Sequence, residues 1–121
     1  MYFHINAKGD VEPCVFCHFA ADNIKGKSLV EVLDSPFFRA IRSRQPYDEN
    51  LLTPCMLIDR PEVAREMVSF PGVSFTNPGA KTFFTQLSRS VDQYAEEYAS
   101  IADPVWVELF KTEEEREKRE T

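Results

Sequence analysis

The segment INAKGDVEPCVFCHF, near the start of the chain, constrains the fold most, because it places two cysteines directly after a tight turn. Tyr2 to Asn6 alternates ring or polar side chains with apolar ones, which is the period of a half-buried strand. The letters NAKGD supply turn residues, with Gly9 suited to a positive φ, and Asp10 to Phe16 resumes an extended pattern. The sequence therefore predicts a β-hairpin whose returning strand delivers Cys14 and Cys17 at its far end.

Two short helices are expected after the hairpin. Ser28 followed by Glu31 matches a capping box, in which each side chain satisfies a free backbone donor of the first helical turn. Ser35 is expected to cap a second helix, with Pro36 at its first position and its end near Arg44.

The rest of the chain reads as loops and helices. The letters NLLTPCMLID indicate a brief apolar loop or strand that carries Cys55, RPEVAREMVSF a short helix, and PGVSFTNPG a connector. From about Ala80 we expect one long amphipathic helix, and Asp103 with Pro104 should restart a last one. Apolar residues recur along the long helix at steps of three and four: Phe84, Leu87, Val91, Tyr94, Tyr98 and Ile101. This stripe is expected to be a packing face, against either this chain's core or another chain, and the letters TEEEREKRET after it a solvated tail.

The expected fold class is α+β: a small β-hairpin followed by short helices, then a helical C-terminal extension with a long amphipathic helix. Composition shifts near residue 72, because every cysteine lies before it and helical patterns dominate after it. We therefore predict two parts, a cysteine-bearing region at residues 1–72 and a helical extension at residues 73–121.

Charge and hydropathy narrow the possible partners. The chain has 121 residues, 43% of them hydrophobic, so it can bury a core. Its 14 basic and 20 acidic residues give a net charge of −6, which makes nucleic acid an unsuitable partner. No apolar run reaches the roughly 20 residues of a membrane span, and the N-terminus lacks the layout of a signal peptide. A cytoplasmic protein is expected.

Three cysteines, Cys14, Cys17 and Cys55, are the candidate metal ligands. Thiolates two residues apart can reach one metal, and these soft ligands select zinc or iron-sulfur clusters. Cys14 and Cys55 each follow a proline, which stiffens the chain beside the sulfur. A zinc site of the Cys3His type would recruit His18 or His4, whereas an iron-sulfur site would need an open iron position or a fourth cysteine that this chain lacks. The alternative is that all three are buried free cysteines that bind nothing.

Other chemical motifs are absent from the sequence. It holds no Gly-rich phosphate loop, no HExxH and no nucleophile elbow. Asp22, Asp59 and Glu62 are assigned to helix caps and the surface. A thioredoxin-like CxxC motif should open a helix, whereas Cys14 and Cys17 follow a hairpin.

Combined, these motifs resemble a known family. The letters GDVEPC, then DNIKGKSLVEVLDSPFFRAIR and a later PC, resemble the C-terminal auxiliary-cluster region of radical SAM enzymes, of the SPASM or shorter twitch type. The resemblance covers residues 2–68. It implies that Cys14 and Cys55 bind an auxiliary iron-sulfur cluster, of the 4Fe-4S type, in an oxidoreductase. Cys17 has a less constant counterpart in that family.

The chain also departs from the family pattern. The pattern has a further cysteine before the glycine, which would fall before Met1, and the CxxxCxxC motif of the SAM-cleaving cluster is absent. We therefore expect an N-terminally truncated region that does not cleave SAM alone, with SAM bound only in the parent enzyme. The expected partner is the N-terminal radical SAM barrel of that parent, and a homodimer through the hairpin edge or the long helix is a further prediction.

Two other functions remain open at this point. One is a zinc-stabilised protein-interaction module that uses Cys14, Cys17, Cys55 and one histidine. The other is a metal-free fragment with reduced cysteines.

Overall fold

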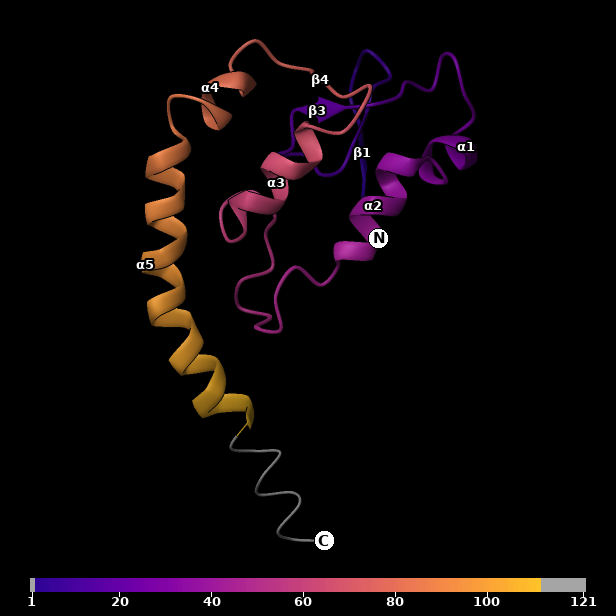
Figure 1. Ribbon diagram of the computed structural model, residues 1–121. Helices are drawn as coiled ribbons and strands as arrows, with labels where there is room; N and C mark the ends of the chain where they lie inside the picture. Colours follow the sequence, from indigo (N-terminus) through magenta and orange to yellow (C-terminus); the bar gives the residue numbers. More distant parts are fainter. Residues whose placement is uncertain (1, 112–121) are drawn as a thin grey trace, which may run out of the picture.

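The computed structural model describes residues 2–111, which form a mixed α+β fold. The described strands are β1 (His4–Ile5), β2 (Val11–Glu12), β3 (Phe19–Ala20) and β4 (Ser74–Phe75). The described helices are α1 (Leu29–Leu33), α2 (Pro36–Arg44), α3 (Pro61–Val68), α4 (Ala80–Phe84) and α5 (Ser88–Trp106), which a π-helical turn, η1 (Val107–Lys111), continues. The predicted fold class is confirmed. In Figure 1 the elements up to α3 form a small body, and α5 runs along one side of it and extends past its end.

The predicted hairpin is present, with shorter strands than expected. β1 and β2 pair antiparallel with Ile5 opposite Val11. The Asn6 side chain accepts hydrogen bonds from the backbone amides of Lys8 and Asp10, which closes the turn. Gly9 takes a φ of +88°, as its position in the turn predicts. The returning strand, β2, ends at Glu12, because the chain then forms the turn that carries the first two cysteines.

A second antiparallel pair joins β3 to β4. Phe19 lies opposite Phe75, and the Thr76 amide donates to the His18 carbonyl at 2.9 Å. The sequence predicted only a connector around β4. A two-residue strand has no alternation to detect, and its partner lies more than 50 residues away.

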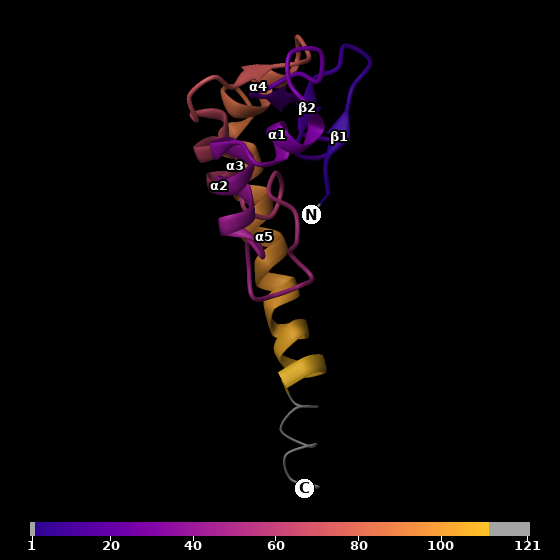
Figure 2. The same ribbon diagram turned by 90° about the vertical axis from the view of Figure 1, so that its right-hand side faces the viewer.

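The first two helices begin where their capping serines predict. The Ser28 hydroxyl accepts from the Glu31 amide, and the Ser35 hydroxyl accepts from the Phe38 amide. Pro36 opens α2, which ends at Arg44 as expected. In Figure 2, α2 and α3 lie close together, and Figure 1 shows α3 between α2 and α5.

The hydrophobic core is built mainly from the first half of the chain. Its buried cluster comprises Val11, Cys17, Phe19, Val32, Phe37, Phe38, Ile41, Met56, Leu57, Val63, Ala64 and Met67. Phe84 of α4 also contributes, with its ring 5.8 Å from that of Phe19 in an edge-on arrangement. The core therefore extends past residue 72, although the division into residues 1–72 and 73–121 stays a prediction.

The predicted long helix is interrupted. It breaks into α4 and α5 around Thr85, where Phe83 and Phe84 turn toward the core. At the other end α5 continues through Pro104 instead of restarting at Asp103. A proline inside a helix removes one backbone hydrogen bond, and here the adjacent Asp103 carboxylate accepts a hydrogen bond from Asn50 at 2.7 Å. The predicted tail lies outside the described residues.

One stripe of α5, which we call the α5 seam, is largely exposed. It comprises Leu87, Val91, Tyr94, Tyr98, Ile101 and Val105. Ile101 is 68% exposed, whereas Ala95 and Ala102 are the buried residues of this helix. Of the predicted apolar stripe, Phe84 packs against this chain's core, whereas the residues from Leu87 onward are largely exposed. Within residues 2–111, no helix combines the length and apolar character needed to cross a membrane.

Candidate metal centre

Cys14 and Cys17 lie in a tight turn directly after β2. The Cys17 amide donates to the Cys14 carbonyl at 3.0 Å, which closes this turn. Pro13, before it, is buried. Cys17 is 2% exposed and belongs to the core, whereas Cys14 is half-buried at its edge. The hairpin therefore delivers both thiols to the same end of the body.

Cys55 is held by a second tight turn. Its amide donates to the Asp59 carboxylate at 2.8 Å, and its carbonyl accepts from the amides of Asp59 and Arg60, each at 3.1 Å. These bonds fix the backbone on both sides of the half-buried thiol. The sequence assigned Asp59 only to caps and surface. An aspartate four residues after a cysteine can accept a hydrogen bond from the cysteine amide, so the spacing of Asp59 from Cys55 is the sequence feature that indicates this turn.

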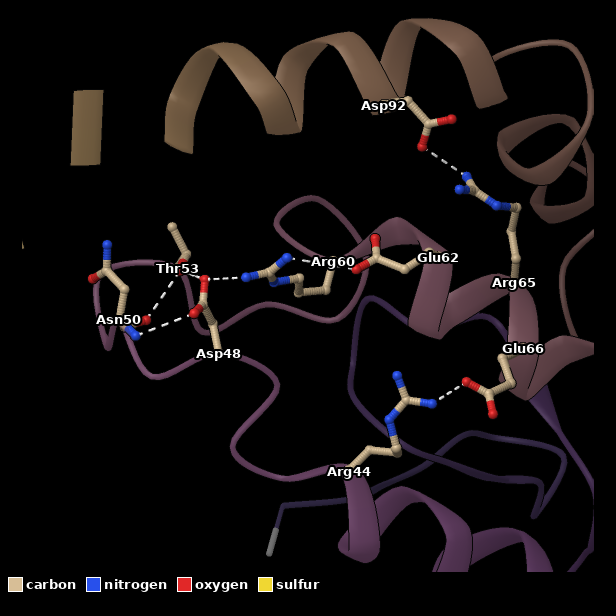
Figure 3. A network of polar contacts seen from close by, with 9 residues as sticks. All are labelled: Arg44, Asp48, Asn50, Thr53, Arg60, Glu62, Arg65, Glu66 and Asp92. Carbon is tan, nitrogen blue, oxygen red and sulfur yellow. Dashed lines mark hydrogen bonds and ion pairs between the residues drawn. The ribbon is translucent and has the colours of Figure 1, made fainter. Parts of the chain in front are cut away.

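A polar network supports the segment that carries Cys55 (Figure 3). Asp48 accepts from the Thr53 hydroxyl at 2.9 Å and from the Arg60 guanidinium at 2.6 Å. Burial acts to raise the pKa of Asp48, but the hydrogen bonds from Thr53 and Arg60 outweigh it, so the net shift is downward. Arg60 also lies 3.7 Å from Glu62 at the start of α3. The network therefore ties residue 48 to the beginning of α3, across the Cys55 turn.

The three thiols border the same hydrophobic core: Cys17 is part of it, and Cys14 and Cys55 pack against it. Burial raises the pKa of the Cys17 thiol strongly, and negative charge on Cys14 and on Cys55 raises it further, as does a hydrogen bond with Cys14. Burial likewise raises the pKa of the Tyr47 hydroxyl, and charge on all three cysteines adds to it. Two turns from distant parts of the chain therefore place the predicted cysteines around one core, within range of one another's charge.

The donor set fits a cationic group held by several thiolates. Three adjacent thiolates repel one another in a buried site unless positive charge lies between them. Among residues 2–111, however, no group of three or more His, Cys, Asp and Glu side chains has the spacing that holds a single metal ion. The zinc ion and the iron-sulfur cluster that the sequence suggests are both cationic groups of this kind.

The two histidines considered for a zinc site lie against Glu12 instead. His18 Nδ1 is 3.6 Å and His4 Nε2 is 3.9 Å from the Glu12 carboxylate. Glu12 is 2% exposed and accepts a hydrogen bond from the Thr76 hydroxyl. The sequence does not predict the contact between Glu12 and Thr76, because an acid in a short strand and a threonine 64 residues later carry no local signal.

Comparison with known families agrees with this geometry. Residues 1–59 match the model of the SPASM family, which is described as an iron-sulfur cluster-binding domain. The match includes both cysteine turns. No curated protein and no solved structure matches the chain.

Proposed function

We propose that Cys14, Cys17 and Cys55 bind an auxiliary cluster of the 4Fe-4S type in a radical SAM oxidoreductase, because residues 1–59 match the model of the SPASM family of iron-sulfur cluster-binding domains. The radical SAM parent, with the barrel that would cleave SAM, is part of the proposal. The chain itself contains no CxxxCxxC motif for that reaction.

The observation that supports this most is the convergence of three thiols from two separate turns. Negative charge on Cys14 and on Cys55 raises the pKa of Cys17, and all three cysteines lie in the segment that matches the family model. A cluster held by cysteines needs several thiolates close together, and two separate turns supply them here.

The residues around the thiols hold them in position. Asn23 donates to the Lys8 carbonyl and to the Asp10 carboxylate, which fixes the hairpin turn before Cys14. The Asp59 carboxylate accepts a hydrogen bond from the Cys55 amide and so fixes the turn that carries Cys55. When bound, a cluster of this kind supplies electron exchange or an open iron for a substrate heteroatom, and burial and hydrogen bonds near the sulfurs tune its potential.

Anaerobic reconstitution of the 121-residue chain with iron and sulfide tests the proposal. We expect a brown protein with about four irons per chain. Cys14→Ala, Cys17→Ala and Cys55→Ala should each lower iron content and visible absorbance. Circular dichroism of each variant separates loss of a ligand from loss of the fold.

His4→Ala and His18→Ala are the matched controls. Both should keep their iron if the ligands are the cysteines. Stoichiometric zinc with no iron uptake, lost on substitution of a histidine, would instead establish the Cys3His module. Unchanged iron in folded Cys14→Ala and Cys55→Ala would overturn the assignment.

A further inference from the structure

A cavity of about 300 Å³ lies beside the turn that carries Cys14 and Cys17. One wall comes from this turn and from the residue two positions after Cys55. The other comes from the segment around α4, outside the part that matches the SPASM family. The side chains that decide its chemistry are Phe16, His18, Leu57, Asn77, Phe83 and Phe84. The cavity has the size of a small ligand site.

The apolar part of the cavity is mainly aromatic. Phe83 and Phe84 meet edge-on with their ring centroids 5.1 Å apart, and Phe84 is anchored on Phe19 of the core. Phe16, between the two cysteines, is 73% exposed. A ring that entered the cavity would therefore meet a fixed aromatic wall and cover an aromatic side chain that water now surrounds.

His18 is oriented from behind by a buried carboxylate. Its Nδ1 lies 3.6 Å from Glu12, and Glu12 is itself held by the Thr76 hydroxyl. Because Nδ1 faces Glu12, the opposite ring nitrogen, Nε2, is the one that can form a hydrogen bond with a ligand. His18 therefore offers a polar ring nitrogen to the cavity.

Asn77 offers the complementary group. Its side-chain oxygen accepts from the Gly79 amide at 3.0 Å. The side-chain NH2 group remains as a donor, with no acceptor among the described residues. A ligand group that both donates and accepts, such as a hydroxyl, satisfies the pair.

We propose that this cavity binds a neutral aromatic ring that carries a hydroxyl group, a phenol. The ring packs between Phe16 and Phe83, and the hydroxyl forms a hydrogen bond with His18 Nε2 and accepts one from Asn77. An anionic ligand should bind more weakly, because the lining contains no lysine or arginine and the Glu12 carboxylate lies behind His18. The site goes beyond cluster binding, since it uses none of the cysteines.

The test uses the 121-residue chain with no iron added and 4-methylphenol as the probe. Ligand-observed NMR should detect binding with a low-millimolar Kd, the affinity expected of so small a ligand. Phe16→Ala should weaken binding at least about fivefold, because one face of the ring loses its contact. Tyr94→Ala, which removes an exposed aromatic ring from α5, should leave Kd unchanged.

Two further probes test the contacts of the hydroxyl with His18 and Asn77: toluene, which lacks the hydroxyl, and 4-methylbenzoate, which carries a negative charge in its place. His18→Ala should weaken 4-methylphenol by about two- to tenfold, the value of one neutral hydrogen bond, while toluene is unaffected. A loss that is equal for both ligands would mean a merely structural role for His18. An equal loss for 4-methylphenol and toluene would overturn the proposal, and so would a lack of 4-methylphenol binding to the wild-type chain. Equal affinity of the wild type and Phe16→Ala for 4-methylphenol, or a Kd for 4-methylbenzoate as low as that for 4-methylphenol, would overturn it as well. Iron content measured separately keeps these outcomes distinct from failure of cluster binding.

Discussion

At the scale of single residues, the corner before Cys14 depends on one glycine and one asparagine. Gly9 has a positive φ, and its carbonyl accepts from the Ile24 amide at 2.9 Å. Asn23 reaches across to Lys8 and Asp10 from a segment 13 to 15 residues away. The turn residues alone predicted the positive φ of Gly9, because this backbone conformation depends on the glycine's own lack of a side chain. The sequence could not predict the contacts of Asn23, which are long-range.

Gly9→Ala should destabilise the fold by about 1–3 kcal/mol. The added methyl would lie 2.9 Å from the Asn23 side-chain oxygen, in a backbone conformation that L residues rarely adopt. Urea unfolding measures the loss. Gly26→Ala is the control, because nothing lies within 4 Å of its added Cβ and its φ is not positive. Equal free energies of unfolding for the two variants would contradict this account of the corner.

Asp48→Asn should lower the free energy of unfolding by about 1 kcal/mol at neutral pH. The folded state holds the pKa of Asp48 below its ordinary value, so its contribution is present above that value and is lost as pH falls through the lowered pKa. The difference between wild type and variant should therefore vanish in strong acid, below the ordinary aspartate pKa of about 3.9. Urea unfolding at a series of pH values measures it. A difference that grows toward acid would refute the role of Asp48.

At the scale of elements, local signals predicted helices well and long-range pairing poorly. Ser28 and Ser35 located α1 and α2 because a cap acts on amides within the same turn. The pairing of β4 with β3 depends on a partner far along the chain. The same distinction applies to the candidate site. The cysteines are candidate ligands from the sequence, and their role stays a prediction, whereas the contacts of Asp59, Glu12 and Thr76 with their neighbours emerged only from the structure.

Phe84→Ala should destabilise the whole fold, by about 2–3 kcal/mol. Its ring contacts Phe19 in the core, so the loss leaves a cavity between α4 and β3. Phe110→Ala removes the same side chain from the 43%-exposed position after α5 and should cost under about 0.5 kcal/mol. Thermal unfolding of both variants provides the comparison. A small effect at Phe84 would mean that α4 is an independent appendage.

At the scale of the whole molecule, the α5 seam is an apolar surface that residues 2–111 leave largely exposed. Its residues follow steps of four and three from Leu87 to Val105, which is the spacing of a helix that packs along another helix. The Tyr94 and Tyr98 rings stack in parallel at 6.2 Å, and the Tyr98 hydroxyl donates to the Leu52 carbonyl at 3.1 Å. The seam is therefore preorganised on its own helix.

We propose that a second copy of the chain covers the α5 seam. The exposed seam has an area on the order of 500 Å², so two copies would bury about 1,000 Å², within the range of a weak dimer. Sedimentation should show dimers that increase with protein concentration. They should also increase with salt, since each copy carries a net charge of −6.

Ile101→Glu should abolish this dimer, because it places a charge in the middle of the seam. Ser100→Glu, the same change at the neighbouring exposed residue outside the seam, should not. A wild-type monomer at all concentrations, or equal dimerisation of both variants, would rule out this interface.

The β3–β4 pair has a practical consequence for anyone who expresses this region. The family match ends at residue 59, and the composition shift suggests a boundary near residue 72. A gene cut at either point would discard the strand that pairs with Phe19 and the hydroxyl that holds Glu12. Such a product would present a bare strand edge and an unsatisfied buried carboxylate, the combination that leads to inclusion bodies. Expression clones should therefore extend at least through α4.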